Sequence, residues 1–166
     1  IRNEYSHFIF VDAHDSFVLF PESSVIEELP LNYGLLSVEK NCWPVQDLAK
    51  NYPCTSSEWK YVNSGNYFMP IWMFLEITKL FPIEYTDDDQ LWLTRVYLSH
   101  RYALHLDYDQ EMFCSLAFKA PDDYKYKLSA IYNLKTDTFP VFFHKNGGTL
   151  DEEADRVLNN ALNKSI

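Results

Sequence analysis

The chain of 166 residues has the length of one domain, and its 47% hydrophobic content is enough to fold around a core. Aromatic residues make up 17% of the sequence, which excludes a disordered tail. The formal net charge is −10 and the basic residues form no cluster, which argues against a nucleic-acid groove and favours a cation, or a ligand carried in on one. No apolar stretch reaches membrane-spanning length.

The first third of the chain predicts short strands and short helices. Phe8 to Val11 form a continuous apolar run, which is typical of a strand covered on both faces. The stretch SVIE at 24–27 is a capping-box pattern that begins a short helix. Residues 35–38 are a second strand candidate. The stretch CWPVQDLAKNYP at 42–53 indicates a turn and a brief helix between two prolines.

Two helices are predicted in the middle of the chain. The stretch IWMFLEITKLF at 71–81 is apolar on nearly every face, which predicts a buried helix. The next helix, at 87–98, is expected to begin at a cap formed by Thr86 or Asp87. We expect its Leu91, Val96 and Leu98 side chains to turn inward.

Further strands and a last helix complete the predicted pattern. Residues 59–70 read as an extended aromatic run, 102–108 alternate like a strand, and FPVFFH at 139–144 is an apolar strand that ends in His144. Residues 149–162 predict a final amphipathic helix. Strands that alternate with helices indicate an α/β sheet, and the absence of a linker predicts one domain over residues 1–166.

Two carboxylates and an imidazole follow predicted strands. Asp12 and Asp15 come after the first strand and His144 closes the last, and ligands of α/β sheets gather at such strand ends. Their oxygen and nitrogen atoms suit Mn²⁺ or Mg²⁺. The alternative is an acidic turn whose carboxylates bond local backbone amides. An aspartyl phosphotransferase is disfavoured, because His14 stands where that class needs a second Asp. Spacing alone leaves the turn and the metal site both open.

Cysteine usage does not decide the compartment. The three cysteines lack the C-x-x-C spacing of a structural zinc site. A disulfide between Cys42 and Cys54 would be compatible with a secreted protein, and its presence stays open.

Six short sequence motifs, taken in their order along the chain, resemble those of a known family. They run from about residue 8 to residue 148 and read FVDAHD, CWP, VNSG, DDDQLWLTRVYL, LDY and FPVFFHKNG. Together they resemble the glycosyltransferase domain of procollagen lysyl hydroxylases. The resemblance implies a GT-A-like mixed sheet flanked by helices, a UDP-sugar donor, Mn²⁺, and a protein or glycan acceptor such as hydroxylysine or galactosyl-hydroxylysine. It also implies the endoplasmic reticulum as location.

The resemblance assigns roles by position. Asp12, Asp15 and His144 would be the metal ligands, and Asp88 and Asp89 would act in transfer of the sugar. The residues that match substrate-binding positions are Trp43 at the sugar pocket, the loop of Asn63, Ser64 and Gly65 beneath the donor, and Asn146 and Gly147 beside it.

Each of these residues also has an ordinary structural interpretation. Trp43 before a proline is more often a packing residue. The acidic run at 87–89 is usual at a solvated helix start, where it favours the macrodipole. Gly65 could supply a turn with positive φ. His144 could be an ordinary histidine at a strand end.

The sequence also departs from the family. Lys145 stands where the family commonly has a small glycine. This lysine could reach a phosphate, although we expect it to face solvent. The family's domain begins with a strand and helix that hold the uridine, and nothing before Ile1 supplies them. We therefore expect a partial catalytic portion or weakened nucleotide binding. The rival hypothesis is a non-catalytic binding domain with a degenerate transferase fold, and inverting and retaining chemistry cannot be separated.

Overall fold

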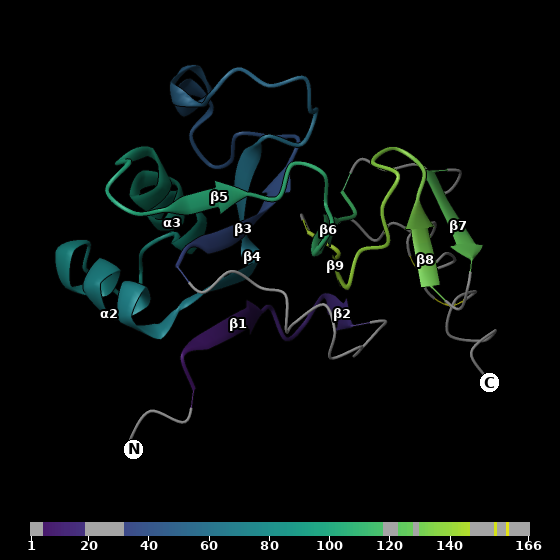
Figure 1. Ribbon diagram of the computed structural model, residues 1–166. Helices are drawn as coiled ribbons and strands as arrows, with labels where there is room; N and C mark the ends of the chain where they lie inside the picture. The colour runs from purple at the N-terminus through teal and green to yellow at the C-terminus, as the bar shows by residue number, and fades with distance from the viewer. Residues whose placement is uncertain are drawn as a thin grey trace.

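The computed structural model describes residues 5–18, 32–117, 123–127 and 130–146, together with positions 155 and 159. The described helices are the 3₁₀ helix η1 (Gln46–Asn51), α2 (Ile71–Leu80) and α3 (Asp89–Leu98). The strands are β1 (His7–Val11), β2 (Ser16–Val18), β3 (Gly34–Glu39), β4 (Tyr61–Pro70), β5 (Leu104–Leu106), β6 (Phe113–Ser115), β7 (Tyr124–Lys127), β8 (Ala130–Asn133) and β9 (Phe142–His144). Figure 1 shows their arrangement.

The strands form three sheets. The four-stranded sheet has the order β1-β4-β3-β5, the three-stranded sheet the order β2-β9-β6, and β7 pairs with β8. Both larger sheets are mixed: β4 runs antiparallel to its neighbours, whereas β3 and β5 are parallel, as are β6 and β9. The α/β class is therefore confirmed, with a mixed sheet consistent with a GT-A-like domain.

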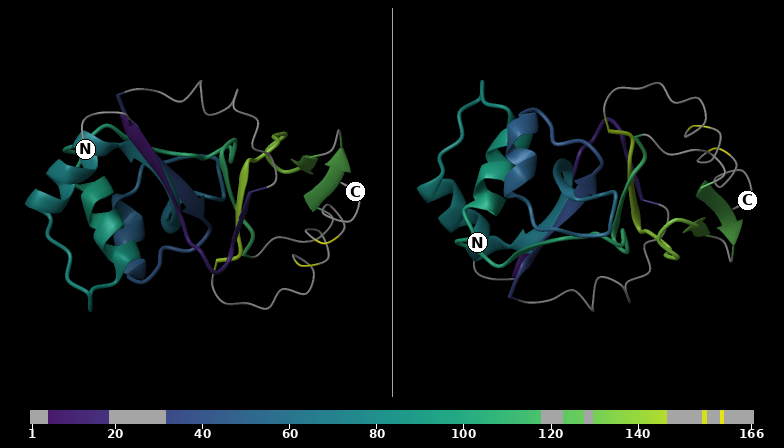
Figure 2. Two further views of the ribbon diagram at one scale, coloured as in Figure 1. Left: turned by 90° about the horizontal axis from the view of Figure 1, so that it is seen from below. Right: turned by 90° about the horizontal axis from the view of Figure 1, so that it is seen from above.

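Alternating side chains join the layers. In β4, Tyr67 and Met69 point into the core shared with α2 and α3, while Phe68 between them points to the opposite face. There Phe68 packs with Phe113 and Phe142 of the three-stranded sheet. This period of two is the expected consequence of strand geometry. The helices thus cover one face of the large sheet and the second sheet covers the other, as the two views in Figure 2 show.

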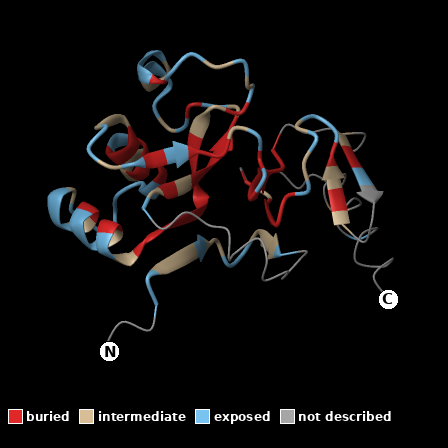
Figure 3. Cartoon of the chain, viewed as in Figure 1, coloured by how far each residue is buried: buried red, intermediate tan, exposed pale blue. Residues whose placement is uncertain are grey.

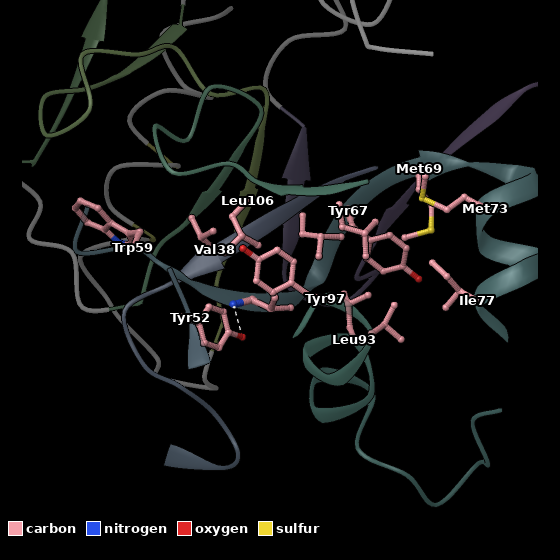
Figure 4. Packing of buried hydrophobic residues seen from close by; sticks show 14 of the residues in the cluster. Val38, Tyr52, Trp59, Tyr67, Met69, Met73, Ile77, Leu93, Tyr97 and Leu106 are labelled. Atoms are coloured by element: carbon pink, nitrogen blue, oxygen red, sulfur yellow. Dashed lines mark hydrogen bonds between the residues drawn. The ribbon is translucent and has the colours of Figure 1, made fainter. Parts of the chain in front are cut away.

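The helix-side core is rich in aromatic residues. Tyr52, Tyr67 and Tyr97 are buried in it, together with aliphatic residues of β3, β4 and α3. The Tyr52 hydroxyl accepts a hydrogen bond from the Val62 backbone N–H at 3.3 Å, drawn as a dashed line in Figure 4. Burial raises the pKa of Tyr67 to about 12, so the phenol stays protonated at neutral pH.

The prediction that residues 71–81 form a buried helix is right in type and wrong in burial. Helix α2 buries only Met73 and Ile77, whereas Trp72, Leu75 and Leu80 are more than half exposed. Figure 3 shows the outer face of this helix in pale blue. An all-apolar pattern cannot reveal that the helix lies at the margin of the sheet and contacts it along one narrow stripe.

Strand β1 was expected to be covered on both faces, and this is right in part, because half-buried Ile9 and Val11 pack against the core on the face opposite to Phe8. It is the edge strand of the four-stranded sheet, pairing with β4 alone. Its Phe8 packs into the helix-side core, but Phe10 is 39% exposed and stacks on Tyr67 instead. Partial burial therefore accounts for the apolar sequence of β1, although the strand lies at the edge of its sheet and not at the centre.

The other predicted elements have mixed outcomes. The brief helix after Pro44 is confirmed as η1, and β5 shows the expected alternation with His105 exposed between two buried leucines. In α3, Val96 is buried as predicted, while Leu91 and Leu98 are only half-buried. The predicted cap is wrong, because the residue that caps α3 is Asp88 and not Thr86 or Asp87.

Some expectations lie outside the described residues, namely the helix at 24–27 and nearly all of the helix at 149–162. The single-domain assignment stays a prediction. All three cysteines have free thiols, so the structure contains no disulfide between Cys42 and Cys54. None of the helices in the described part of the chain combines the length and apolar character needed to cross a bilayer.

Candidate active site

A tight turn carries the chain from the four-stranded sheet to the three-stranded sheet and holds both aspartates. The Asp12 backbone N–H donates to the Gly65 carbonyl of β4 at 2.7 Å. Three residues later, the Asp15 carbonyl accepts from the Lys145 N–H at 2.8 Å, just after β9. The turn is therefore anchored at one end to each sheet. Its sequence spacing places both carboxylates over the junction between the sheets.

The same junction places His144. Ser16 of β2 pairs with His144 of β9, so the imidazole lies beside the carboxylate that precedes Ser16. The ring rests on the backbone of Gly65, where a Cβ would overlap three of its atoms. Because no positive φ is recorded for this glycine, close approach of the ring explains it better than a turn does.

The three predicted ligands converge. One ligand atom from each of Asp12, Asp15 and His144 can be chosen so that all lie within 4.8 Å of one another. His144 Nε2 is 3.2 Å from Asp15 Oδ1. That oxygen is buried and accepts no hydrogen bond, which is costly unless a cation neutralises it. Two carboxylates and one imidazole on one side of a cleft fit a divalent ion with open positions for further ligands.

The acidic-turn interpretation accounts for only part of this geometry. Asp12 Oδ1 does accept the His14 N–H at 3.2 Å, as a turn aspartate would. Burial lowers the pKa of His144, while Asp15 and Asp12 oppose that shift. A neutral imidazole is the form that binds metals.

A cleft of about 510 Å³ opens beside these ligands. Its lining includes four carboxylates, those of Asp12, Asp15, Glu39 and Asp89, and no lysine or arginine among the described residues that form it. An anionic ligand such as a diphosphate would be repelled from such a surface. A cation would have to accompany it.

Trp43 lies at this cleft and is 59% exposed, so its ring is not a packing residue. A flat apolar face beside polar groups can pack on a sugar ring. Asp89 also lines the cleft. Asp88 does not line the cleft. Its carboxylate caps α3 by accepting a hydrogen bond from the Leu91 N–H at 2.7 Å, as expected if the acidic run is an ordinary helix start.

The remaining predicted residues are partly where the sequence suggested. Asn63, Ser64 and Gly65 line the cleft, but they belong to strand β4 and not to a loop. Asn146 also lines it, whereas Gly147 lies outside the described residues. Lys145 does not face solvent as expected, because it is half-buried and pairs with Asp155 at 2.8 Å.

Sequence reasoning missed two buried residues of the cleft, Glu39 and Gln90. Glu39 ends β3 and is only 7% exposed, and its carboxylate accepts from Gln90 Nε2 and, at 2.9 Å, from Asn146 Nδ2. Burial raises the pKa of Glu39, and these hydrogen bonds oppose the shift. The available signal was its position directly after a predicted strand, as for Asp12. Gln90 offered no signal beyond its place after the acidic run.

Sequence comparison finds a matching family model and several similar proteins. A family model described as the PLOD GT domain matches residues 2–163. The human multifunctional procollagen lysine hydroxylase and glycosyltransferase LH3 is 29% identical over 151 residues, which cover 85% of this chain. The corresponding Caenorhabditis elegans protein is 30% identical over 151 residues and 84% of this chain.

A viral protein is similar as well. The uncharacterized protein R699 of Acanthamoeba polyphaga mimivirus is 31% identical over 140 residues, or 80% of this chain. In each case the relative is much longer. The chain spans 20% of the human protein, 21% of the nematode protein and 30% of the viral protein.

Proposed function

The chain belongs to the family of PLOD glycosyltransferase domains, and on that premise we propose that it transfers a hexose, glucose or galactose, from a UDP-sugar to an acceptor hydroxyl with the help of Mn²⁺ or Mg²⁺. The observation that supports the metal requirement most strongly is the convergence of Asp12, Asp15 and His144 beside an acidic cleft. These residues would hold the ion. When bound, the ion would supply positive charge against the departing diphosphate.

The side chains of the cleft would bind and orient the sugar. The exposed Trp43 ring would pack on the apolar face of the hexose, since it lines the cleft without being buried. Asp89 would accept hydrogen bonds from sugar hydroxyls or stabilise positive charge that develops at the anomeric carbon. We withdraw Asp88 from this role, because its carboxylate is already used as a helix cap.

Glu39 is the buried acid of the cleft. Its two oxygens each accept one amide N–H, so the carboxylate is held in one orientation at the inner wall. A fixed carboxylate there would orient a hydroxyl of the donor or the acceptor by accepting a hydrogen bond through its remaining lone pairs.

The acceptor is proposed from the relatives' names and from charge. The human and nematode relatives are named for procollagen lysine hydroxylation and glycosyl transfer. A hydroxylysine-bearing or galactosyl-hydroxylysine-bearing protein would carry basic groups that the net charge of −10 attracts. Such an acceptor would be met in the secretory pathway.

Calorimetry with UDP tests the metal requirement. UDP should bind in the presence of Mn²⁺ and at least tenfold more weakly without it, and Asp12→Asn should abolish the difference. Hydrolysis of UDP-glucose and UDP-galactose without acceptor then identifies the donor. Binding of UDP that is independent of Mn²⁺, with Asp12→Asn unchanged, would instead support a degenerate, non-catalytic domain.

A further inference from the structure

Backbone N–H groups, which can only donate, fix the orientation of three side-chain amides in the cleft. The Gly65 N–H donates to Asn63 Oδ1 at 3.1 Å. The Ser64 N–H points to Gln90 Oε1 at 3.4 Å, and the Ala117 N–H donates to Asn146 Oδ1 at 3.0 Å. In each amide the oxygen is therefore identified, and the nitrogen must face the other way.

The orientation of Asn63 determines which nitrogen of His144 carries the proton. Asn63 Oδ1 lies 2.8 Å from His144 Nδ1 and can only accept, so Nδ1 bears the hydrogen. In the neutral ring, Nε2 then has a free lone pair. That lone pair faces Asp15 Oδ1, 3.2 Å away, an acceptor that has no hydrogen to offer. Two lone pairs that face one another at the cluster of candidate ligands leave room for a cation to bridge them.

Gln90 holds Asn63 in this orientation from the other side. Gln90 Oε1 accepts from Asn63 Nδ2 at 3.4 Å, while Gln90 Nε2 donates to the Glu39 carboxylate. In the series His144, Asn63, Gln90 and Glu39, each side chain thus donates a hydrogen bond to the next one. All four side chains are buried, at 8% exposure or less.

We propose that Asn63 and Gln90 are positioning residues that hold His144 in the Nδ1–H tautomer, so that Nε2 can bind a divalent cation together with Asp12 and Asp15. This inference rests on the proposed function for the identity of the cation, and it reassigns Asn63 from contacting the sugar to orienting a ligand. A partner that fixes the ring of a ligating histidine commonly changes metal affinity 10- to 100-fold.

Nitrogen-15 NMR of the metal-free protein tests the tautomer directly and needs neither donor sugar nor activity. The wild-type His144 ring should show a protonated Nδ1 and an unprotonated Nε2. In Asn63→Leu the ring loses its acceptor, and the proton should move to Nε2, where Asp15 can accept it. Asn63→Asp keeps an oxygen in the same place, so the wild-type tautomer should return.

Mn²⁺ titration followed by electron paramagnetic resonance supplies the second readout. Affinity should fall 10- to 100-fold in Asn63→Leu, fall less in Gln90→Leu, and stay at or above the wild-type value in Asn63→Asp. Asn133→Leu is the matched control: it removes another buried amide, which donates to Gln110 at 3.1 Å in a separate layer, and should leave Mn²⁺ affinity unchanged.

The outcomes separate this inference from the proposed function. An Nε2–H tautomer in the wild-type protein, or a tautomer that Asn63→Leu does not alter, overturns the inference whatever the protein binds. A wild-type protein with the Nδ1–H tautomer and no affinity for Mn²⁺ or Mg²⁺ overturns the proposed function, and the positioning of His144 still stands.

Discussion

Replacing Gly65 by alanine should weaken the proposed metal site by displacing the His144 ring. A Cβ at this position would lie 2.0 Å from His144 Cε1, the nearest atom of the ring, whereas non-bonded heavy atoms normally keep about 3.5 Å apart. The ring would therefore have to move by about 1.5 Å, and metal–ligand distances tolerate only about 0.2 Å. We expect Mn²⁺ affinity to fall about 10- to 100-fold, or about 1.4 to 2.7 kcal/mol of binding free energy.

The assay is Mn²⁺ titration of the folded variant, with thermal unfolding measured in parallel. Gly34→Ala is the matched control, because its Cβ would press on Leu104 Cδ2 at 2.6 Å in the same sheet but away from the cleft. That variant should lose thermal stability and keep its affinity for Mn²⁺. A folded Gly65→Ala protein that binds Mn²⁺ like the wild type would refute the reasoning, since the imidazole could then not be both in its observed place and a ligand.

Trp43→Ala should raise the KM for the donor sugar about tenfold, because the exposed residue lines the cleft, and should leave Mn²⁺ affinity unchanged in a parallel titration, because Trp43 is not one of the proposed ligands. An unchanged KM would return Trp43 to a packing role. Burial lowers the pKa of His144, so the imidazole stays neutral to below pH 6.5. Mn²⁺ titrations should therefore show affinity that is retained at pH 6.5 and lost on further acidification. A loss of affinity already above pH 7 would contradict this. Asp107→Ala should lower the free energy of unfolding in urea by about 3 kcal/mol, because the Asp107 carboxylate accepts hydrogen bonds from three backbone N–H groups, two of them buried. A change below about 0.5 kcal/mol would argue against that role.

The convergence of the three candidate ligands could be predicted from the sequence, because each of them lies at or near the end of a strand. Asp12 and His144 each come at or just after the end of an apolar run, and strand ends of different segments meet at the junction of the sheets. The spacing of Asp12 and Asp15 could not say which sheets the turn joins. That depends on β2, a strand of three residues too short to leave a periodic pattern.

Other features could not be predicted because they depend on tertiary placement. The exposure of Trp72 follows from where α2 lies relative to the sheet, and an apolar helix looks the same in sequence whether central or marginal. Glu39 stands in no motif, and the block that contains Gln90 assigns it no role. Only the fold reveals that the two side chains are buried and hydrogen-bonded to one another. Asp88 and Asp89 are adjacent in sequence, yet one caps a helix and the other lines the cleft.

The proposed metal site is tested most directly by the anomalous diffraction signal of crystals grown with Mn²⁺ and UDP. We expect one manganese peak bonded to carboxylate oxygens of Asp12 and Asp15 and to Nε2 of His144, at about 2.0 to 2.3 Å, with diphosphate oxygens on its open side. A nucleotide bound in the cleft with no manganese peak, or a peak that His144 does not touch, would contradict it.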